Sequence, residues 1–359
     1  MKNLLSLTAL FLFAQIALSQ EVTIPGTQSK QITSSIVSGQ EYQLHIMLPG
    51  GYANSTKTYP VVYLMDSQWD FPLVTALYGE QYYDGFIPQM IIVGVTWGGR
   101  SPSPDSLRAR DYTPTNVKGT PQSGGADKFL SFMKEELFPY IEKNYRADKS
   151  DRTLIGCSLG GLFTMYTLFT HPEMFQRYVA ASPAFMWDND VLSQYEKKYA
   201  ANKSSPSAKL FTCVGGVERS VPGFQKLTKQ LNDRHYKQLQ IESRVLENTG
   251  HSGTKGEGYA RGLQFVFKKP SLQLSSTALD KYTGKYQLPD GSTTEIKKEN
   301  NQLFLYFSPN DKVPLFVSNE KELYSTSQYM NIKLNFDEHK NIAGGDIEMF
   351  GGSLTVKKL

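Results

Sequence analysis

The chain has 359 residues, 40% of them hydrophobic and 12% aromatic, which is enough apolar material for one large domain and a smaller second one. The formal net charge is +4 and is spread along the chain, so the composition excludes the concentrated basic surface of a nucleic-acid-binding protein. Two cysteines are too few for a disulfide framework.

The first 19 residues have the pattern of a secretory signal peptide. Lys2 precedes a mostly apolar stretch, Leu4 to Ala17, and Ala17-Leu18-Ser19 is a small-x-small cleavage pattern before Gln20. The apolar stretch is too short to span a bilayer comfortably. We therefore expect a periplasmic or secreted protein with no membrane span in its mature form; a retained N-terminal anchor is the alternative.

Apolar runs that alternate with helical patterns predict an α/β fold over residues 20–270. Continuous apolar runs are typical of buried parallel strands, and a spacing of three or four is typical of helices. The combination predicts a mostly parallel sheet of the α/β-hydrolase kind, with helices on both faces. The expected strands are 42–48, 60–65, 90–95, 153–155, 177–181, 210–214 and 239–246; the expected helices are 126–145, 161–169, 223–234 and 257–267.

Between the third strand and the first of these helices lies a polar segment, 98–125, rich in Gly, Pro and Ser. It is long for a connection, so we expect a functional loop over the site.

The pattern changes after Pro270, and residues 276–359 predict a small antiparallel β domain. Short apolar stretches separated by polar turns are typical of hairpins. We expect hairpin turns at Asp290-Gly291 and Gly344-Gly345. The expected strands are 284–288, 303–307, 315–317, 332–336 and 346–349.

Ser158 is the candidate nucleophile. It is the centre of Gly156-Cys157-Ser158-Leu159-Gly160, a G-x-S-x-G pattern with a predicted strand before it and a predicted helix after it. A serine on such a tight turn needs small neighbours, and the turn lifts its hydroxyl above the sheet. The helix N-terminus, with the N–H of Leu159, points at any oxyanion formed there. The alternative is a glycine-rich turn that contains a serine by chance.

A serine hydroxyl needs a base, and His251 is the best placed of the five histidines. It lies in a loop between the last strand and the last helix of the α/β domain, after the serine, as the Ser–acid–His order of α/β-hydrolases requires. The acid should follow the preceding strand, where Glu218 is the one carboxylate before the next helix. Asp188, after the strand before that, is the other candidate acid.

An oxyanion hole needs two backbone N–H donors. One is Leu159, and the position of the loop after 60–65 indicates Gln68 as the second. Asp66, Arg110 and Trp187 lie at strand ends where such sheets bind ligands, and arginine suits an anionic substrate such as a catecholate or a sugar acid. A structural ion pair of Arg110 with Asp111, and a core position for Trp187, are the alternatives.

The two cysteines are expected to be buried free thiols. Cys157 and Cys213 lie on strands that the usual order separates by the strand at 177–181, and two strand spacings are about 9–10 Å. That separation exceeds what a disulfide tolerates.

At these motifs the chain resembles the putative esterase family of α/β-hydrolases, which includes esterase D, siderophore esterases of the enterobactin type, feruloyl esterases and secreted mycolyltransferases. The likeness spans roughly residues 21–268 and is greatest to the siderophore esterases, on the segment Ser182-Pro183 to Trp187. The segments that carry it are 60–66, 110–114, 152–162, 175–183, 214–218 and 250–252.

This resemblance implies a triad of Ser158, His251 and Glu218, an oxyanion hole from Gln68 and Leu159, and a substrate crevice near Trp187. Ser67 departs from the family, because many relatives have glycine there. The start of the tail, 279–286, resembles a small lipocalin-like domain found behind secreted bacterial esterases.

The expected reaction is ester hydrolysis through an acyl-enzyme, without a metal or organic cofactor, on a small-molecule or carbohydrate-linked ester. Acyl transfer to an alcohol uses the same residues and is the first alternative. A binding protein with a silent catalytic centre is the second. The sequence leaves the ester and the oligomeric state open.

Overall fold

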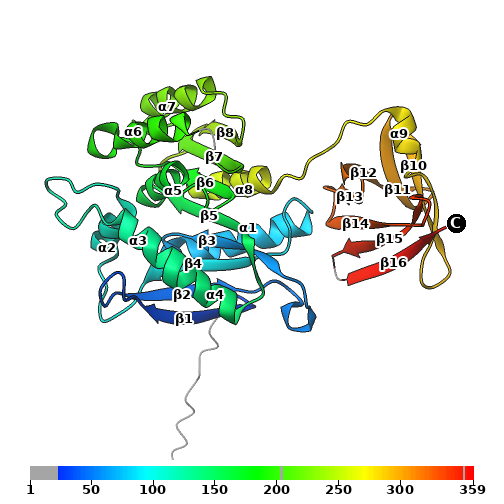
Figure 1. Ribbon diagram of the computed structural model, residues 1–359, viewed down its shortest axis with the longest axis horizontal. Coiled ribbons are helices and arrows are strands. Elements are labelled where there is room, and N and C mark those ends of the chain that lie inside the picture. Colours follow the sequence, from blue (N-terminus) through cyan, green and yellow to red (C-terminus); the bar gives the residue numbers. More distant parts are fainter. Residues whose placement is uncertain (1–22, 203–204, 351) are drawn as a thin grey trace, which may run out of the picture.

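The computed structural model describes residues 23–202, 205–350 and 352–359. They form an α/β domain and a β-barrel, joined by an extended segment around residues 268–275 (Figure 1). The predicted signal peptide, 1–19, lies outside the described residues.

The α/β domain contains a sheet of eight strands in the order β1-β2-β4-β3-β5-β6-β7-β8. β2 is antiparallel to both of its neighbours, and the other pairs, from β4 to β8, are parallel. This confirms the predicted fold class. The strands are β1 Thr27–Thr33, β2 Glu41–Met47, β3 Tyr59–Leu64, β4 Ile91–Trp97, β5 Ala147–Cys157, β6 Arg177–Ala181, β7 Ala208–Gly215 and β8 Leu239–Leu246.

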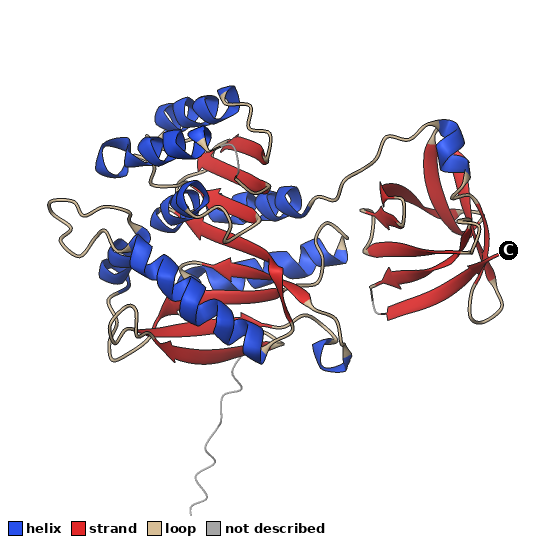
Figure 2. Ribbon diagram, in the orientation of Figure 1, coloured by secondary structure: helices blue, strands red, loops and turns tan. Residues whose placement is uncertain are grey.

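Helices cover both faces of this sheet (Figure 2). Alternate residues of one strand belong to different cores: Tyr63 is part of the core that includes residues of α3 to α7, whereas Val62 is part of the core that includes residues of α1 and α8. All of β4 is buried, as its unbroken apolar run predicts. The helices are α1 Ser67–Tyr83, α2 Pro104–Tyr112, α3 Ala126–Phe132, α4 Phe138–Asn144, α5 Leu159–Thr170, α6 Trp187–Ala201, α7 Val221–Asp233 and α8 Thr254–Phe267.

The predicted helix 126–145 contains a π-helical turn, Met133–Leu137, between α3 and α4. There the N–H of Phe138 donates to the carbonyl of Met133, five residues back. Pro139 follows directly. A proline inside a helix has no N–H to donate and its ring clashes with the preceding turn, so the local widening accommodates it.

The prediction that residues 98–125 form a loop was wrong over α2. This helix begins after Ser103 with Pro104 in its first turn and Asp105 beside it, which is a recognisable start signal. Because the segment contains few apolar residues, the periodicity that would indicate a helix is weak. Its Gly, Pro and Ser content therefore favoured a loop.

The C-terminal part forms a closed antiparallel barrel in which each strand pairs with its neighbours in sequence and β16 closes on β9. The Asp290-Gly291 turn is confirmed, but Gly344-Gly345 lies inside a strand and is not a turn. A Cβ on Gly344 would lie 2.1 Å from the carbonyl oxygen of Val356, so close strand approach explains this glycine. The short helix α9 Ser276–Asp280 precedes strands β9 Gly284–Gln287, β10 Thr293–Glu299, β11 Gln302–Ser308, β12 Asp311–Asn319, β13 Glu322–Ser325, β14 Met330–Phe336, β15 Ile342–Met349 and β16 Gly352–Lys358.

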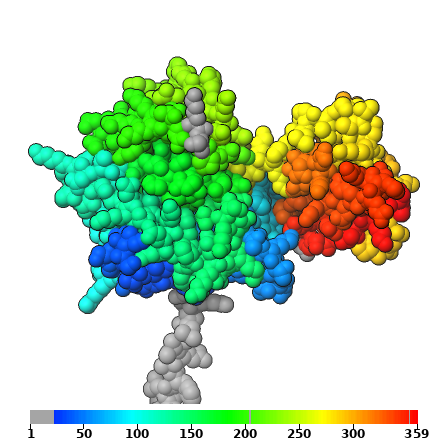
Figure 3. Space-filling model, in the orientation of Figure 1, coloured from blue at the N-terminus to red at the C-terminus, as the bar shows by residue number. Residues whose placement is uncertain are grey.

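The barrel contacts one edge of the α/β domain (Figure 3). Lys57, just before β3, pairs with Glu348 at 2.7 Å. At the C-terminal end of α1, the N–H of Tyr329 donates to the carbonyl of Tyr83 at 3.2 Å, and the rings of Tyr82 and Tyr329 are 4.5 Å apart. These contacts place the barrel at the end of the sheet where the parallel strands begin.

Cys157 and Cys213 are free and buried, as predicted, with β6 between their strands. In the part of the chain that the structure describes, no helix is both long and apolar enough to cross a membrane.

Candidate active site

Ser158 occupies the turn between β5 and α5 in a strained conformation, with φ 59° and ψ −118°. Its N–H donates to the carbonyl of Ala181 at 3.0 Å, which ties the turn to the neighbouring strand. A Cβ on Gly156 would lie 2.3 Å from the carbonyl oxygen of Gly160, and one on Gly161 would lie 3.0 Å from that of Ala181. The glycines therefore make this turn possible, as expected for a nucleophile elbow.

His251 and Glu218 lie together at the end of the sheet where the parallel strands finish. Glu218 follows β7, and His251 follows β8, so two neighbouring parallel strands deliver them to one place. Nδ1 of His251 lies 2.8 Å from Oε2 of Glu218. The imidazole is half exposed while the carboxylate is 12% exposed, so the pair presents its base to solvent and keeps its acid inside.

Glu218 is held by donors on both of its oxygens. Oε1 accepts from the Ser182 hydroxyl at 2.5 Å and the Gly215 N–H at 2.8 Å. Burial by itself raises the pKa of Glu218, but the hydrogen bonds from Ser182, His251 and Gly215 outweigh it and leave the pKa below its usual value. The ionised acid fixes the proton of His251 on Nδ1 and leaves Nε2 available as a base.

Asp188, the other candidate acid, is not the partner of His251. It begins a left-handed turn, Asp188 to Asp190, in which all three residues have positive φ. Among the described residues, the carboxylate that hydrogen-bonds His251 is Glu218.

Two residues that support Glu218 and His251 were not predicted from the sequence. Ser182, at the end of β6, has φ 37°, and its Oγ lies 3.1 Å from Oγ1 of Thr254. The Thr254 hydroxyl donates to the carbonyl of His251 at 2.7 Å, so the loop that carries the base is linked to the residue that holds the acid. For Ser182 the available signal was a polar residue directly after a buried strand, as at Ser158.

Gln68 and Leu159, the predicted donors of the oxyanion hole, both lie in the first turn of a helix, and their role stays a prediction. Leu159 is the first residue of α5 and Gln68 the second of α1, which begins after Asp66 in a left-handed conformation with φ 55°. Neither N–H has a hydrogen-bond partner within the described residues. The nitrogen and oxygen of the Gln68 side chain are also buried, and neither has a hydrogen-bond partner among the described residues.

Two cations flank an exposed tryptophan beside these groups. Trp69 is 49% exposed, and the guanidinium of Arg108 lies 5.3 Å from its ring centroid and the ammonium of Lys255 6.0 Å. The buried carboxylate of Asp66 holds Arg108 through two bonds of 2.7 and 2.9 Å, and Asp70 holds Lys255 at 2.6 Å.

Asp66 was predicted to bind substrate, but in the structure its side chain binds Arg108. The carboxylate is 2% exposed, and both oxygens are occupied by Arg108. Burial raises the pKa of Asp66 above its usual range, while Arg108 acts in the opposite direction. Asp66 therefore positions Arg108, and a direct contact with substrate stays a prediction.

Arg110 and Trp187, the other predicted substrate contacts, make structural contacts. Arg110 forms two bonds to Asp111, at 2.7 and 2.8 Å, and Asp111 also accepts from Trp97 at 2.7 Å. The indole N–H of Trp187 lies within 3.3 Å of both oxygens of Thr115. Both side chains hold the 98–125 segment in place, in agreement with the structural alternatives, and their contact with substrate is untested.

Within residues 23–202, 205–350 and 352–359, no three His, Cys, Asp or Glu side chains gather closely enough to hold a metal ion.

A mostly parallel sheet with a strained serine after β5, an acid after β7 and a histidine after β8 is the arrangement of the α/β-hydrolase class. The chain belongs to the family described as "Putative esterase", whose model matches residues 34–252. A second model, described as a domain of unknown function (DUF3471), matches residues 268–354 and so covers most of the barrel.

Relatives with assigned activities agree with this family. The ferri-bacillibactin esterase BesA of Bacillus subtilis (strain 168) is 32% identical over 217 residues, which are 56% of this chain and 74% of that protein. The siderophore triacetylfusarinine C esterase of Aspergillus fumigatus is 26% identical over 239 residues, 63% of this chain and 80% of that protein.

Solved structures give the same result. The BES protein from Bacillus cereus is similar with a TM-score of 0.63 and 29% identity, over 69% of this chain and 98% of that one. An IroE-like serine hydrolase from Shewanella oneidensis is similar with a TM-score of 0.61 and 27% identity, over 71% of this chain and 84% of that one. The protein is thus a serine esterase that resembles siderophore esterases, as the sequence analysis predicted.

Proposed function

We propose that the protein is an exported esterase that hydrolyses a siderophore-type ester through a triad of Ser158, His251 and Glu218. The observation that carries the proposal is the 2.8 Å hydrogen bond between His251 and Glu218, at the same end of the parallel strands as the strained turn that presents Ser158. Export is proposed on the pattern of residues 1–19 alone.

In the proposed mechanism, Nε2 of His251 removes the proton of the Ser158 hydroxyl as Oγ attacks the ester carbonyl. The N–H groups of Leu159 and Gln68 stabilise the oxyanion of the tetrahedral intermediate. His251 then donates its proton to the leaving alcohol, and the acyl group stays on Ser158. Water, deprotonated by His251, attacks the acyl-enzyme and releases the acid.

The substrate class follows from the rim of the site and from the relatives. Trp69 offers a flat apolar face, and beside it Arg108 and Lys255, whose charges are balanced by Asp66 and Asp70, offer N–H donors for the oxygen atoms of a substrate. An aromatic ester with oxygen acceptors fits this combination, and a ferric catecholate ester has both properties. The assigned activities of the two relatives described above, on ferri-bacillibactin and triacetylfusarinine C, favour a siderophore over a polysaccharide ester.

The first test is hydrolysis of p-nitrophenyl butyrate by the wild type, Ser158→Ala, His251→Ala and the matched control His339→Ala, whose residue is exposed in the barrel. Loss of the serine or histidine is expected to lower kcat about a million-fold. His339→Ala should retain wild-type activity. Full activity in Ser158→Ala would contradict the mechanism.

The second test compares ferri-bacillibactin with a feruloylated arabinose ester at equal concentration. We expect a higher kcat/KM for ferri-bacillibactin, and a larger loss for it than for p-nitrophenyl butyrate when Lys255 is changed to Met. A preference for the feruloyl ester would overturn the substrate class and leave the serine mechanism intact. Transfer of the acyl group to added alcohols in preference to water would favour the acyltransferase alternative.

A further inference from the structure

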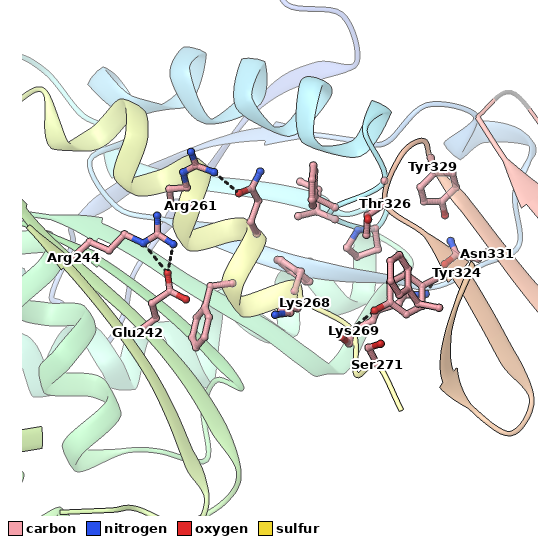
Figure 4. Close-up of a pocket in the computed structure, with 18 residues that line it drawn as sticks. Glu242, Arg244, Arg261, Lys268, Lys269, Ser271, Tyr324, Thr326, Tyr329 and Asn331 are labelled. Atoms are coloured by element: carbon pink, nitrogen blue, oxygen red, sulfur yellow. Dashed lines mark hydrogen bonds and ion pairs between the residues drawn. The ribbon is translucent and has the colours of Figure 1, made fainter. Parts of the chain in front are cut away.

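A second cavity lies far from Ser158, between the α/β domain and the barrel. Its volume is about 480 Å³, within the range of small-molecule sites, and domain interfaces are a common place for such sites. Figure 4 shows Arg261 and Lys268 on the α/β side and Tyr324 and Tyr329 on the barrel side. The cavity lies at the end of the sheet where the parallel strands begin, whereas Ser158 and His251 lie at the end where these strands finish.

The charged groups of this cavity do not balance. Arg244 is neutralised by Glu242 at 2.6 Å, and Lys269 by Glu322 at 2.5 Å. Two further cations, Arg261 and Lys268, line the same cavity.

Neither of these two cations has a close carboxylate. Arg261 reaches Glu257 only at 4.0 Å, between two side chains that are about half exposed, and Lys268 forms no ion pair among the described residues. An exposed ion pair at that distance contributes little. The cavity therefore offers Lys268, which has no ion pair among the described residues, and Arg261, whose one ion pair is long and exposed.

Flat apolar groups surround these charges. Phe86 is 37% exposed although it is a large apolar side chain, and it faces this cavity together with Phe265. On the barrel side the rings of Phe316 and Tyr324 lie 5.5 Å apart. Aromatic walls favour a ligand with an aromatic body of its own.

We propose that this cavity is a binding site for a small aromatic acid, with its ring between the aromatic walls and its carboxylate or sulfonate at Arg261 and Lys268. The ligand would contact both domains at once, which gives the barrel a function that the esterase site does not need. The inference rests on the cavity alone and is independent of the substrate of Ser158.

The test uses two dyes that share one aromatic body. 8-Anilinonaphthalene-1-sulfonate carries an anion, and N-phenyl-1-naphthylamine is its neutral counterpart. Fluorescence titration of the full chain is expected to show one saturable site for the anionic dye and weaker binding of the neutral one. Prior labelling of Ser158 with a fluorophosphonate should leave the titration unchanged.

Charge reversal then locates the site. Arg261→Glu and Lys268→Glu should each raise the Kd of the anionic dye about tenfold, the loss of roughly one charged contact. Lys143→Glu, an exposed residue on α4, makes the same change in net charge and should leave Kd within twofold. The melting temperature without dye shows whether each variant is folded, and both positions are exposed.

Equal affinity for both dyes would overturn the proposal. So would unchanged binding in folded Arg261→Glu, or loss of binding after fluorophosphonate labelling, because the dye would then occupy another surface or the esterase site.

Discussion

Replacing Glu218 with glutamine turns one carboxylate oxygen into an NH₂ group, and the neighbours of Glu218 determine which one. Oε1 faces the Gly215 N–H at 2.8 Å and the Ser182 hydroxyl at 2.5 Å, whereas Oε2 faces His251 at 2.8 Å and the Ser220 hydroxyl at 3.4 Å. An NH₂ group at the first position would oppose a fixed backbone donor and leave it unsatisfied, at a cost of about 1–3 kcal/mol.

The amide oxygen is therefore expected to take the first position and the NH₂ group to face His251. Facing a donor, Nδ1 of His251 must become the acceptor, which moves the ring proton to Nε2. In this tautomer Nε2 cannot remove a proton from Ser158. The equivalent change in a serine protease lowers kcat about 10⁴-fold, and a loss of about 10³–10⁴ corresponds to about 4–5.5 kcal/mol of transition-state stabilisation.

The assay is kcat for p-nitrophenyl butyrate, together with the ¹⁵N chemical shifts of His251, which report the tautomer. Asp188→Asn is the matched control, because it makes the same substitution in the other candidate acid. We expect kcat of the control to stay within about twofold. Glu218→Gln with kcat within tenfold of the wild type would refute the assignment of the acid, as would an equal loss in Asp188→Asn.

Three further predictions concern stability and the thiols. A Cβ on Gly258 would lie 2.5 Å from the Cys213 sulfur, whereas one on Gly256 meets open space, so Gly258→Ala should destabilise by about 1–3 kcal/mol and Gly256→Ala should be neutral or stabilising in urea unfolding. Burial raises the pKa of both Cys157 and Cys213 to about 12, so Ellman's reagent should find no thiol in the native protein and two after denaturation; one or none would contradict free cysteines. The pKa of Glu218 is lowered in the folded state, so its ionised form stabilises the fold above about pH 4.5 and this contribution is lost as pH falls through the folded pKa. The difference in melting temperature between wild type and Glu218→Ala should shrink below pH 4.5; a difference that grows there would refute the sign.

The nucleophile turn could be predicted from sequence because its chemistry and its backbone impose the same residues. Ser158 must adopt a strained conformation, and a Cβ on Gly156 would overlap the backbone of Gly160, so local sequence alone records the geometry. Glu218 and His251 were found for a different reason: parallel strands end at one edge, so position after a strand predicts position in space.

The contacts that hold these groups could not be predicted, because they join residues far apart in the sequence. Ser182 reaches Glu218, and Arg108 reaches Asp66, only after several strands have been placed side by side. The prediction of a hairpin turn at Gly344-Gly345 was wrong for a related reason. A glycine pair is typical of a turn, and only the barrel register shows that close approach of a neighbouring strand requires it.

The position of the barrel limits how it can act on the esterase site. It contacts the end of the sheet where β3 begins, so it cannot cover Ser158, which lies at the opposite end of the strands. Helix α1, 17 residues or about 25 Å long, joins the two: its second residue, Gln68, offers an N–H at the site, and its last turn packs on Tyr329. Helix α8 joins them too, from Lys255 at the rim to Phe265 in the second cavity. Strand β8 joins them as well, because Glu242 and Arg244 line that cavity and His251 follows the end of the strand. Coupling between a ligand of the cavity and ester hydrolysis therefore has three direct routes, α1, α8 and β8, and both helices pack on the same face of the sheet.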